Sequence, residues 1–206
     1  MEIITKIEKD INRLENKIID TILDPKVKEK IDKLKIDEND PFGIDRQTLK
    51  LTALVINFLY KYWNRVEVFN KENIPKDGPV LIIANHGGVL PIDAAHIGTS
   101  ILLETDPPKL VRTLVERFLP RLPYVYTFMT KVGQVVGTYE NAEIILNLGE
   151  ILQIFPEGSK GASKPYYKYY ELEEFNVGFM ELAIRKKVPI IPVGVVGSME
   201  QTLVLF

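Results

Sequence analysis

Residues 80–93 read Val-Leu-Ile-Ile-Ala-Asn-His-Gly-Gly-Val-Leu-Pro-Ile-Asp, and this stretch decides the fold. It opens with a continuous apolar run after Gly78-Pro79, the pattern of a strand buried on both faces. The run stops at Asn85-His86, and Pro91 suits the first position of a helix because the N–H that proline lacks would be unpaired there. His86 is therefore expected at the carboxyl end of a buried strand, where open α/β sheets bind ligands.

We interpret His86 and Asp93 as a catalytic pair. A neutral imidazole suits proton abstraction near neutral pH, and a carboxylate on its other ring nitrogen fixes the tautomer. Gly87 and Gly88 let the backbone bring the histidine back toward Asp93 and leave room for a substrate. The alternative is a buried structural histidine, with Asp93 as a charge at a helix N-terminus. The chain has two histidines, and the position of this one beside a glycine pair favours catalysis.

The composition is that of an ordinary globular protein, with 206 residues, 46% hydrophobic and 26% charged. A net charge of −2 argues against a nucleic-acid-binding polycation. The lack of cysteine excludes disulfides, thiolate metal sites and cysteine nucleophiles, and it fits a reducing compartment. We expect no signal peptide and no membrane-spanning helix, because the N-terminus is charged and no apolar run reaches about 18 residues.

The N-terminal residues predict a helical extension over 1–43. An amphipathic helix is expected over 3–23, and Asp24-Pro25 predicts a cap and a second helix to about residue 34. Residues 38–43 form a polar break that we interpret as a hinge. The apolar stripe favours packing on the domain or on a partner helix, including self-association, over lying on a membrane. Its members are Ile4, Ile7, Ile11, Leu14, Ile18 and Ile22.

A second unit is expected over 44–206, with a truncated C-terminus because the chain ends on the apolar run 202–206. A helix over 46–63 either lies at a membrane interface, which Tyr62 and Trp63 suit, or covers the sheet as a core helix. A short strand is expected over 66–69.

Strands and helices alternate through the rest of the chain. This alternation predicts an α/β fold with a mostly parallel (mixed) central sheet and helices on both faces. The aromatic stretch 116–131 lines an apolar tunnel or joins the core. A loop rich in Gly, Ser and Lys is expected over 159–165. Strands are expected over 80–84, 110–115, 133–138, 151–155 and 188–193, and helices over 91–103, 140–148 and 176–187.

Three stretches resemble one family when taken in order: Asn85-His86 with Asp93, Phe155-Pro156-Glu157-Gly158, and Val188-Pro189-Ile190-Ile191-Pro192-Val193. They resemble the glycerolipid acyltransferases of the PlsC type, which act on lysophosphatidate and lysophospholipids, over residues 66–197. Most members have His-x4-Asp, whereas six residues separate His86 from Asp93. The Gly-Gly and Leu-Pro-x-Asp version is similar to a sub-branch that includes diacylglycerol acyltransferase-like proteins.

The resemblance implies acyl transfer from acyl-CoA or acyl-carrier protein to a hydroxyl of a glycerolipid or lysophospholipid. His86 would take the hydroxyl proton and Asp93 would orient the imidazole, with no acyl-enzyme, metal or cofactor. We expect backbone N–H groups near Gly87-Gly88 or Gly158 to stabilise the oxyanion.

The family associates Glu157 and Gly158 with the acceptor, although a solvated Glu157 is the structural alternative. Thr138 stands where members with a glycerol-phosphate acceptor usually carry an arginine. A phosphate clamp is then absent or comes from Lys160, Lys164 or Lys168, although a solvated lysine loop is the commoner meaning. The expected substrate-binding residues are Asn85, Gly87, Gly88, Thr138, Phe155, Pro156, Glu157, Gly158, Lys160 and Lys164.

Two other functional classes remain open. A metal-dependent hydrolase could use His86, Asp93 and His96, since Asp93 and His96 share a helix face. A non-catalytic lipid-binding protein could keep the same fold. The lipid substrate class and helix 46–63 predict peripheral association with the cytoplasmic face of a membrane.

Overall fold

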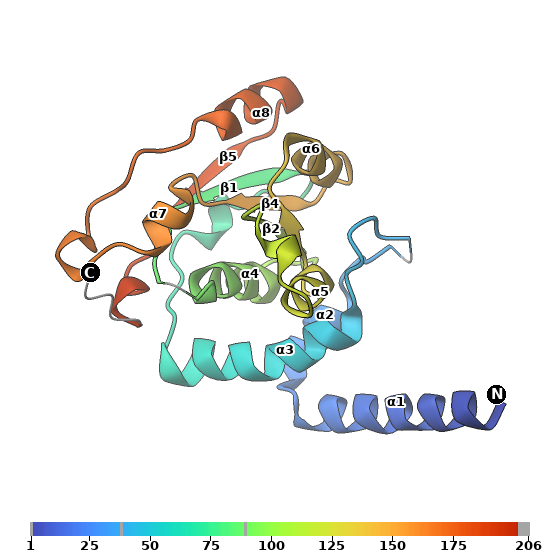
Figure 1. The fold of residues 1–206 in the computed structure, drawn as a ribbon. Helices are drawn as coiled ribbons and strands as arrows, with labels where there is room; N and C mark the ends of the chain where they lie inside the picture. The colour runs from blue at the N-terminus through green and yellow to red at the C-terminus, as the bar shows by residue number, and fades with distance from the viewer. Residues whose placement is uncertain (1, 38, 89, 202–206) are drawn as a thin grey trace.

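The computed structural model describes residues 2–37, 39–88 and 90–201 and is built around one five-stranded sheet (Figure 1). The strand order is β3-β2-β4-β1-β5, and every recorded pair is parallel. The expected α/β class is confirmed, with a wholly parallel pairing. The strands are β1 (Val80–Ala84), β2 (Val111–Val115), β3 (Gln134–Val136), β4 (Ile151–Ile154) and β5 (Ile190–Val193).

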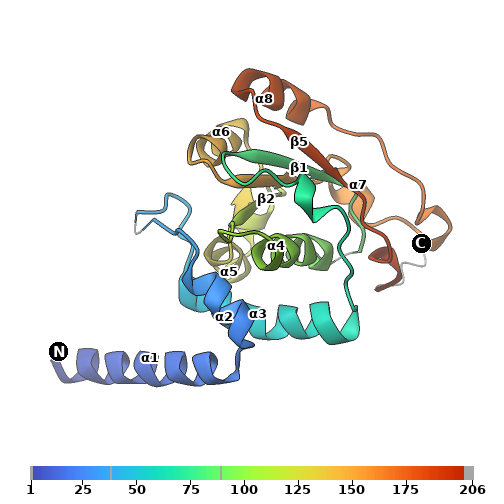
Figure 2. The ribbon, with the colours of Figure 1, turned by 180° about the vertical axis from the view of Figure 1, so that it is seen from behind.

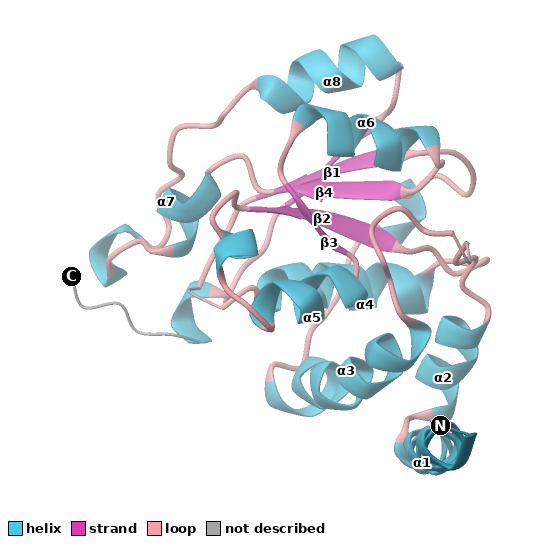
Figure 3. Ribbon diagram, turned by 45° about the vertical axis from the view of Figure 1, so that its right-hand side comes forward, coloured by secondary structure: helices cyan, strands magenta, loops and turns pink. Residues whose placement is uncertain are grey.

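Helices cover both faces of the sheet, as expected (Figure 3). One face carries α6 (Tyr139–Asn147) and α8 (Gly178–Lys186), and the other carries α4 (Ile92–Glu104) and α5 (Val125–Lys131). Beyond α4 and α5 lie further helices, which add an outer layer on that side. These are α1 (Glu2–Ile22), α2 (Pro25–Asp32) and α3 (Arg46–Phe58), with a π-helical turn, η1 (Leu59–Trp63), after α3.

Strand β1 is buried along its whole length because the two helical layers enclose it. Leu81 and Ile83 face the layer of α6 and α8, whereas Val80, Ile82 and Ala84 face α4. Side chains alternate between the faces of a strand, so a strand covered on both sides must be apolar at every position. This is the physical reason for the uninterrupted apolar run.

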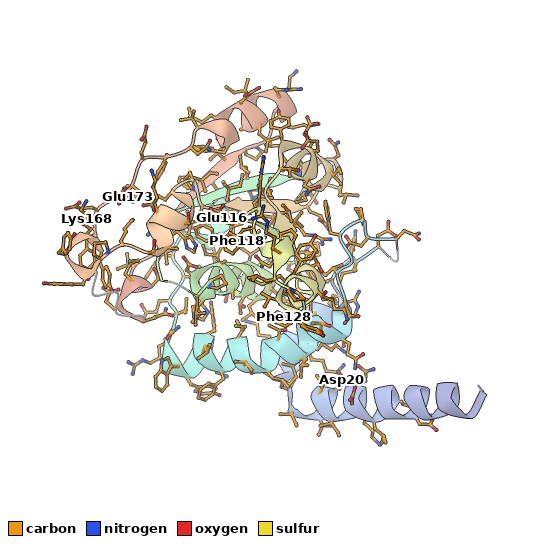
Figure 4. All side chains as sticks on the ribbon, in the orientation of Figure 1. Asp20, Glu116, Phe118, Phe128, Lys168 and Glu173 are labelled. Atoms are coloured by element: carbon orange, nitrogen blue, oxygen red, sulfur yellow. The ribbon has the colours of Figure 1, made fainter. Side chains whose placement is uncertain are left out.

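The N-terminal helices form as expected, but the part of the predicted α1 stripe whose side chains are described, Leu14, Ile18 and Ile22, does not pack on the domain. Leu14, Ile18 and Ile22 are more than half exposed, whereas Ile19 and Leu23 are buried. Figure 2 shows α1 projecting past α2 and α3, away from the sheet. The side chain of Asp20 lies on the α3-facing side of α1 and pairs with Lys50 at 2.8 Å (Figure 4). The side chains of Ile4, Ile7 and Ile11 lie outside the described part.

Helix α3 faces both protein and solvent. Ala53 and Leu54 pack against the buried cluster of Leu23, Val27 and Ile31. The opposite side carries a row of exposed apolar residues. The helix therefore matches neither the core-helix alternative nor the interfacial alternative by itself. Its members are Leu51, Val55, Phe58, Tyr62 and Trp63. Within residues 2–37, 39–88 and 90–201, no helix has the length and apolar character needed to cross a bilayer.

Arg112, buried on β2, ties the polar break to the sheet. Its guanidinium pairs with Asp40 and, at 2.9 Å, with Glu150. The Asp40 carboxylate also accepts the backbone N–H groups of Phe42 and Ile44. Burial opposes ionisation of Asp40, but these donors outweigh it and hold the pKa of Asp40 below its usual value.

Two expected segments differ from the structure. The strand expected over 66–69 is wrong: these residues form no strand, and the N–H of Val66 donates a hydrogen bond to the carbonyl of Tyr60 in η1. The loop expected over 159–165 contains a short helix, α7 (Gly158–Ala162). The predicted C-terminal truncation concerns residues 202–206, which lie outside the described part. The 3-10 turns are η2 (Lys71–Asn73), η3 (Leu119–Arg121), η4 (Tyr166–Lys168) and η5 (Met199–Gln201).

The aromatic stretch 116–131 contributes little to the core. Phe118, Leu122 and Tyr124 are exposed, because η3 and the turn before α5 lie at the surface. Phe128 and Met129 on α5 line a cavity described below, as the tunnel alternative anticipated for part of the stretch. Figure 4 labels Phe118 and Phe128.

Candidate active site

The five parallel strands direct their carboxyl ends to one edge of the sheet, and polar residues gather there. His86 follows β1, Glu116 follows β2, Thr138 follows β3 and Glu157 follows β4. Helix α7 follows β4 at this edge (Figure 1).

The structure brings His86 and Asp93 together. Nδ1 of His86 lies 2.6 Å from Oδ2 of Asp93, which is almost fully buried at 1% exposure. The backbone N–H of Gly87 donates to the same oxygen at 2.9 Å, and that of Ala94 donates to the other at 2.7 Å. Because a carboxylate only accepts hydrogen bonds, Nδ1 carries the proton and Nε2 is the basic nitrogen.

The imidazole of His86 is fixed by packing as well. It stacks on Phe155, with ring centroids 4.3 Å apart and planes inclined by 25°. Gly161 of α7 lies so close that a Cβ there would stand 3.2 Å from that of His86. Phe155, which directly follows β4, therefore helps to orient the histidine that follows the neighbouring strand β1.

Glu157 is buried and links His86 to two other segments of the chain. Its carboxylate accepts the backbone N–H groups of His86 at 3.0 Å and Glu173 at 2.8 Å, and it pairs with Lys164. Burial opposes its ionisation, but the hydrogen bond from Lys164 and the two backbone donors hold the pKa of Glu157 below its usual value. The solvated alternative for Glu157 is wrong, since the side chain is fully buried. Glu173 is labelled in Figure 4.

One of the three lysines considered for a phosphate clamp is engaged by another protein group. Lys164 is 3% exposed and is committed to Glu157, which argues against it as a phosphate ligand. Lys160 on α7 and Lys168 in η4 are exposed. The Thr138 hydroxyl caps α6 by accepting the N–H of Asn141 at 3.1 Å.

The anticipated oxyanion donors are also engaged. The N–H of Gly87 is used by Asp93, and the N–H of Gly158 donates to the carbonyl of Phe155 at 3.0 Å. The N–H of Gly88 donates at 3.2 Å to the thioether sulfur of Met199, a weak acceptor. Of these three N–H groups, that of Gly88 is the one whose present acceptor, the Met199 sulfur, a substrate oxygen would replace most easily.

Asn85 and Pro156 have structural partners. Both polar atoms of the Asn85 amide bond to the backbone of Val195, at 2.9 and 2.7 Å, and fasten the segment after β5. Pro156 is buried, and its carbonyl accepts the N–H of Asn176 at 2.9 Å.

Two cavities flank α4. The first, of about 590 Å³, lies among α3, α4, α5 and β2 and is largely apolar. Its lining includes Pro91 and Ile92, the two residues before Asp93, and extends to Leu102 and Leu34. The second, of about 710 Å³, lies between α4, residues 64–74 and the segment after β5. Asp93 and His96 line the second cavity.

His96 is not placed to complete a metal site with His86 and Asp93. Its Nε2 lies 2.7 Å from the amide nitrogen of Asn64. Within the part of the chain that the structure describes, no group of three or more histidine or acidic side chains could hold a metal ion.

The sequence analysis did not identify several residues that lie at this edge of the sheet. Glu116 accepts the N–H of Ser159 at 3.2 Å, and its place directly after an expected strand was the available signal. Ser198 and Met199 pack against Gly87, and no sequence motif marks them. Glu116 is labelled in Figure 4.

Comparison with known proteins gives a consistent result. A family described as Acyltransferase matches residues 65–196. An uncharacterised protein of Mycobacterium tuberculosis is 36% identical over 163 residues, covering 78% of this chain and 46% of that protein. A human "DGAT1/2-independent enzyme synthesizing storage lipids" is 32% identical over 130 residues, covering 63% and 39%. A probable 1-acyl-sn-glycerol-3-phosphate acyltransferase of Mycoplasma pneumoniae is 29% identical, covering 73% and 56%. The chain thus spans about half the length of these relatives.

Proposed function

The chain belongs to the acyltransferase family, and on this premise we propose that it moves a fatty acyl group from an acyl thioester to a hydroxyl of a glycerolipid or lysophospholipid. The observation that carries the proposal is the 2.6 Å contact between Nδ1 of His86 and Oδ2 of Asp93. It supports a neutral imidazole whose Nε2 acts as general base.

The reaction needs one proton relay. Nε2 of His86 takes the proton of the acceptor hydroxyl as its oxygen attacks the thioester carbonyl. The tetrahedral intermediate then collapses, the carbon–sulfur bond breaks, and the departing thiolate takes the proton back from the imidazolium. Asp93 stabilises that imidazolium throughout. No acyl-enzyme forms, and the donor is acyl-CoA or acyl-carrier protein.

The first cavity suits the acyl chain. Its lining is dominated by apolar side chains of α3, α4 and α5, and its volume of about 590 Å³ is in the range of ligand sites. Pro91 and Ile92 line it and directly precede Asp93, which contacts His86, so we place the thioester at these residues.

An uncharged acceptor suits the site better than a phosphate-bearing one. Thr138 stands at the usual arginine position and caps α6, while Lys164 is buried with Glu157. An anion that lacks a paired cation would be costly to hold in such a site. We therefore propose mono- or diacylglycerol as the acceptor class.

We also propose that the protein works peripherally at the cytoplasmic face of a membrane. The exposed apolar row of α3 and η1, which ends in Trp63 at 71% exposure, supports this. Co-sedimentation with neutral and anionic liposomes tests it, and Phe58→Ser with Trp63→Ser should reduce the bound fraction several-fold. Equal binding by this variant and the wild type contradicts the assignment of the docking surface.

The central experiment is mass spectrometry of products after incubation of the purified chain with mixed acyl-CoA and a panel of acceptors. The panel contains monoacylglycerol, diacylglycerol, lysophosphatidate and lysophosphatidylcholine. His86→Ala and Asp93→Asn should each lower the rate by about 10²–10⁴-fold. Full activity of His86→Ala overturns the assignment, and release of free fatty acid that a chelator abolishes would favour the hydrolase alternative.

A further inference from the structure

The second cavity carries a polar group that the catalytic pair does not use. His96 is 7% exposed, and its Nδ1 has no hydrogen-bond partner within the described residues. The amide nitrogen of Asn64 lies 2.7 Å from Nε2 and, as placed, donates to it. Nδ1 then carries the ring proton, so His96 presents an unpaired donor. Leaving a buried donor unpaired is costly, which points to an occupant with an acceptor oxygen.

The lining of this cavity combines apolar and polar surface. Its apolar lining includes Ile82, Ile97 and Ile101. Its charged lining residues are two basic and three acidic ones: Arg65, Lys71, Glu67, Asp93 and Glu104. Lys71 pairs with Glu104 at 2.5 Å, so the remaining balance is negative. This balance disfavours a phosphate and suits an uncharged ligand with an apolar part.

The cavity lies next to the chemistry. Asp93 lines it, and His96 stands three residues further along α4, so the two side chains share a helix face about 5–6 Å apart. Asp93 contacts His86 directly. A ligand held by His96 therefore lies within about one helical turn of the catalytic pair, on the opposite side of α4 from the first cavity.

We propose that the second cavity binds the glyceride part of an uncharged acceptor and that His96 donates a hydrogen bond from Nδ1 to one of its oxygens. This inference rests on the proposed function and adds to it a site and a specificity-determining residue. The acceptor then lies on the opposite side of α4 from the acyl chain of the donor.

Calorimetric titration of the full chain with 1-monooctanoylglycerol, without any acyl donor, tests the site. His96→Phe keeps an aromatic ring beside Tyr60 but removes the donor, and it should raise Kd about tenfold. His96→Asn places an amide N–H near the position of Nδ1 and should stay within about threefold of the wild type. Thr21→Val, an exposed residue of α1 outside both cavities, is the control and should leave Kd unchanged.

Two outcomes overturn the inference: equal Kd values for His96→Phe and the wild type, or tighter binding of octanoyl lysophosphatidate than of monooctanoylglycerol. If His96→Phe fails to fold, nitrogen NMR of the wild type decides. The His96 Nδ1 signal should shift with ligand, and an unchanged signal refutes the contact. Because no turnover is involved, an absence of acyl transfer would remove the proposed function without changing these binding results.

Discussion

The backbone N–H of His86 donates a hydrogen bond to Oε1 of Glu157 at 3.0 Å, which links the histidine after β1 to the Phe-Pro-Glu-Gly stretch after β4. The same carboxylate holds Lys164 and the N–H of Glu173. With its carboxylate engaged by three protein donors, Glu157 is placed to position His86.

Replacing Glu157 should therefore affect kcat more than the acceptor KM. Glu157→Gln leaves the Lys164 ammonium buried without its counter-charge, so we expect a loss of about 3–5 kcal/mol in unfolding free energy. The amide has one acceptor oxygen in place of two; with that oxygen on Lys164 and the Glu173 N–H, the His86 N–H faces the amide NH₂ and loses its acceptor, so kcat should fall with little change in KM. Urea unfolding and steady-state kinetics measure both. Glu157→Gln with Lys164→Met should recover part of the stability, whereas a rise in acceptor KM at constant kcat would place Glu157 on the substrate.

Much of the fold could be predicted because its signals are local. The run 80–84 is apolar at each position since both faces of β1 are covered, and Asp24 caps α2 through the N–H of Lys26 at 2.9 Å. The strand expected over 66–69 was wrong. The composition of this segment suits a strand, but the N–H of Val66 donates to the carbonyl of Tyr60 in the preceding helical turn. The local sequence pattern does not say whether a neighbouring strand is available for such a segment to pair with.

The site could be predicted only in part, for a similar reason. His86 and Asp93 are near in sequence and adjoin a glycine pair. Lys164, in contrast, lies in the segment 159–165, whose composition predicts a solvated loop, and its buried pairing with Glu157 could not be expected. The stripe of α1 shows the same limit, because periodicity identifies an apolar face without saying which protein surface covers it.

Gly87 should tolerate no side chain unless the neighbouring side chains of Ser198 or Met199 are made smaller. A Cβ there would stand 2.2 Å from Oγ of Ser198 and 2.9 Å from the sulfur of Met199. We expect Gly87→Ala to cost about 1–3 kcal/mol and to lower kcat by disturbing the N–H that holds Asp93. Adding Ser198→Gly should restore part of both, measured by thermal unfolding and acyl transfer. An unchanged Gly87→Ala protein would contradict the packing.

Stability should fall on acidification in two windows. Burial holds the pKa of His96 below its usual 6.5, against the opposing charge of Asp93, so the unfolded chain binds the proton more readily. The stability from His96 is thus complete above pH 6.5 and is lost as pH falls through the lower folded pKa. The lowered pKa of Glu157 gives the same sign below its usual 4.5. Urea midpoints between pH 7 and pH 3 test this, and His96→Asn should flatten the upper window alone.

The Asp40–Arg112 pair should matter more than surface pairs of similar geometry. Arg112 is 1% exposed, and Asp40→Asn leaves it with Glu150 alone, so we expect a loss of about 3 kcal/mol in unfolding free energy. The exposed pair of Lys33 and Glu29, at 2.6 Å, is the matched control, and Glu29→Gln should change stability little. Equal effects in urea unfolding would show that burial adds nothing to the first pair.

Gly98 offers a way to separate helix stability from acyl-chain length. It lines the first cavity on α4, six residues or about 9 Å beyond Ile92, and a Cβ there would meet only Val111, at 3.9 Å. Gly98→Ala should therefore stabilise the protein by about 0.5–1 kcal/mol, because alanine favours the helix.

The larger Gly98→Met occupies the path proposed for the chain. Its kcat/KM for palmitoyl-CoA should fall at least about tenfold, while that for octanoyl-CoA stays within about twofold, because a short chain ends before the new side chain. Competition assays with mixed donors give the ratio directly, and Gly98→Ala is the control for backbone effects. A uniform decrease over all chain lengths would place the acyl chain elsewhere.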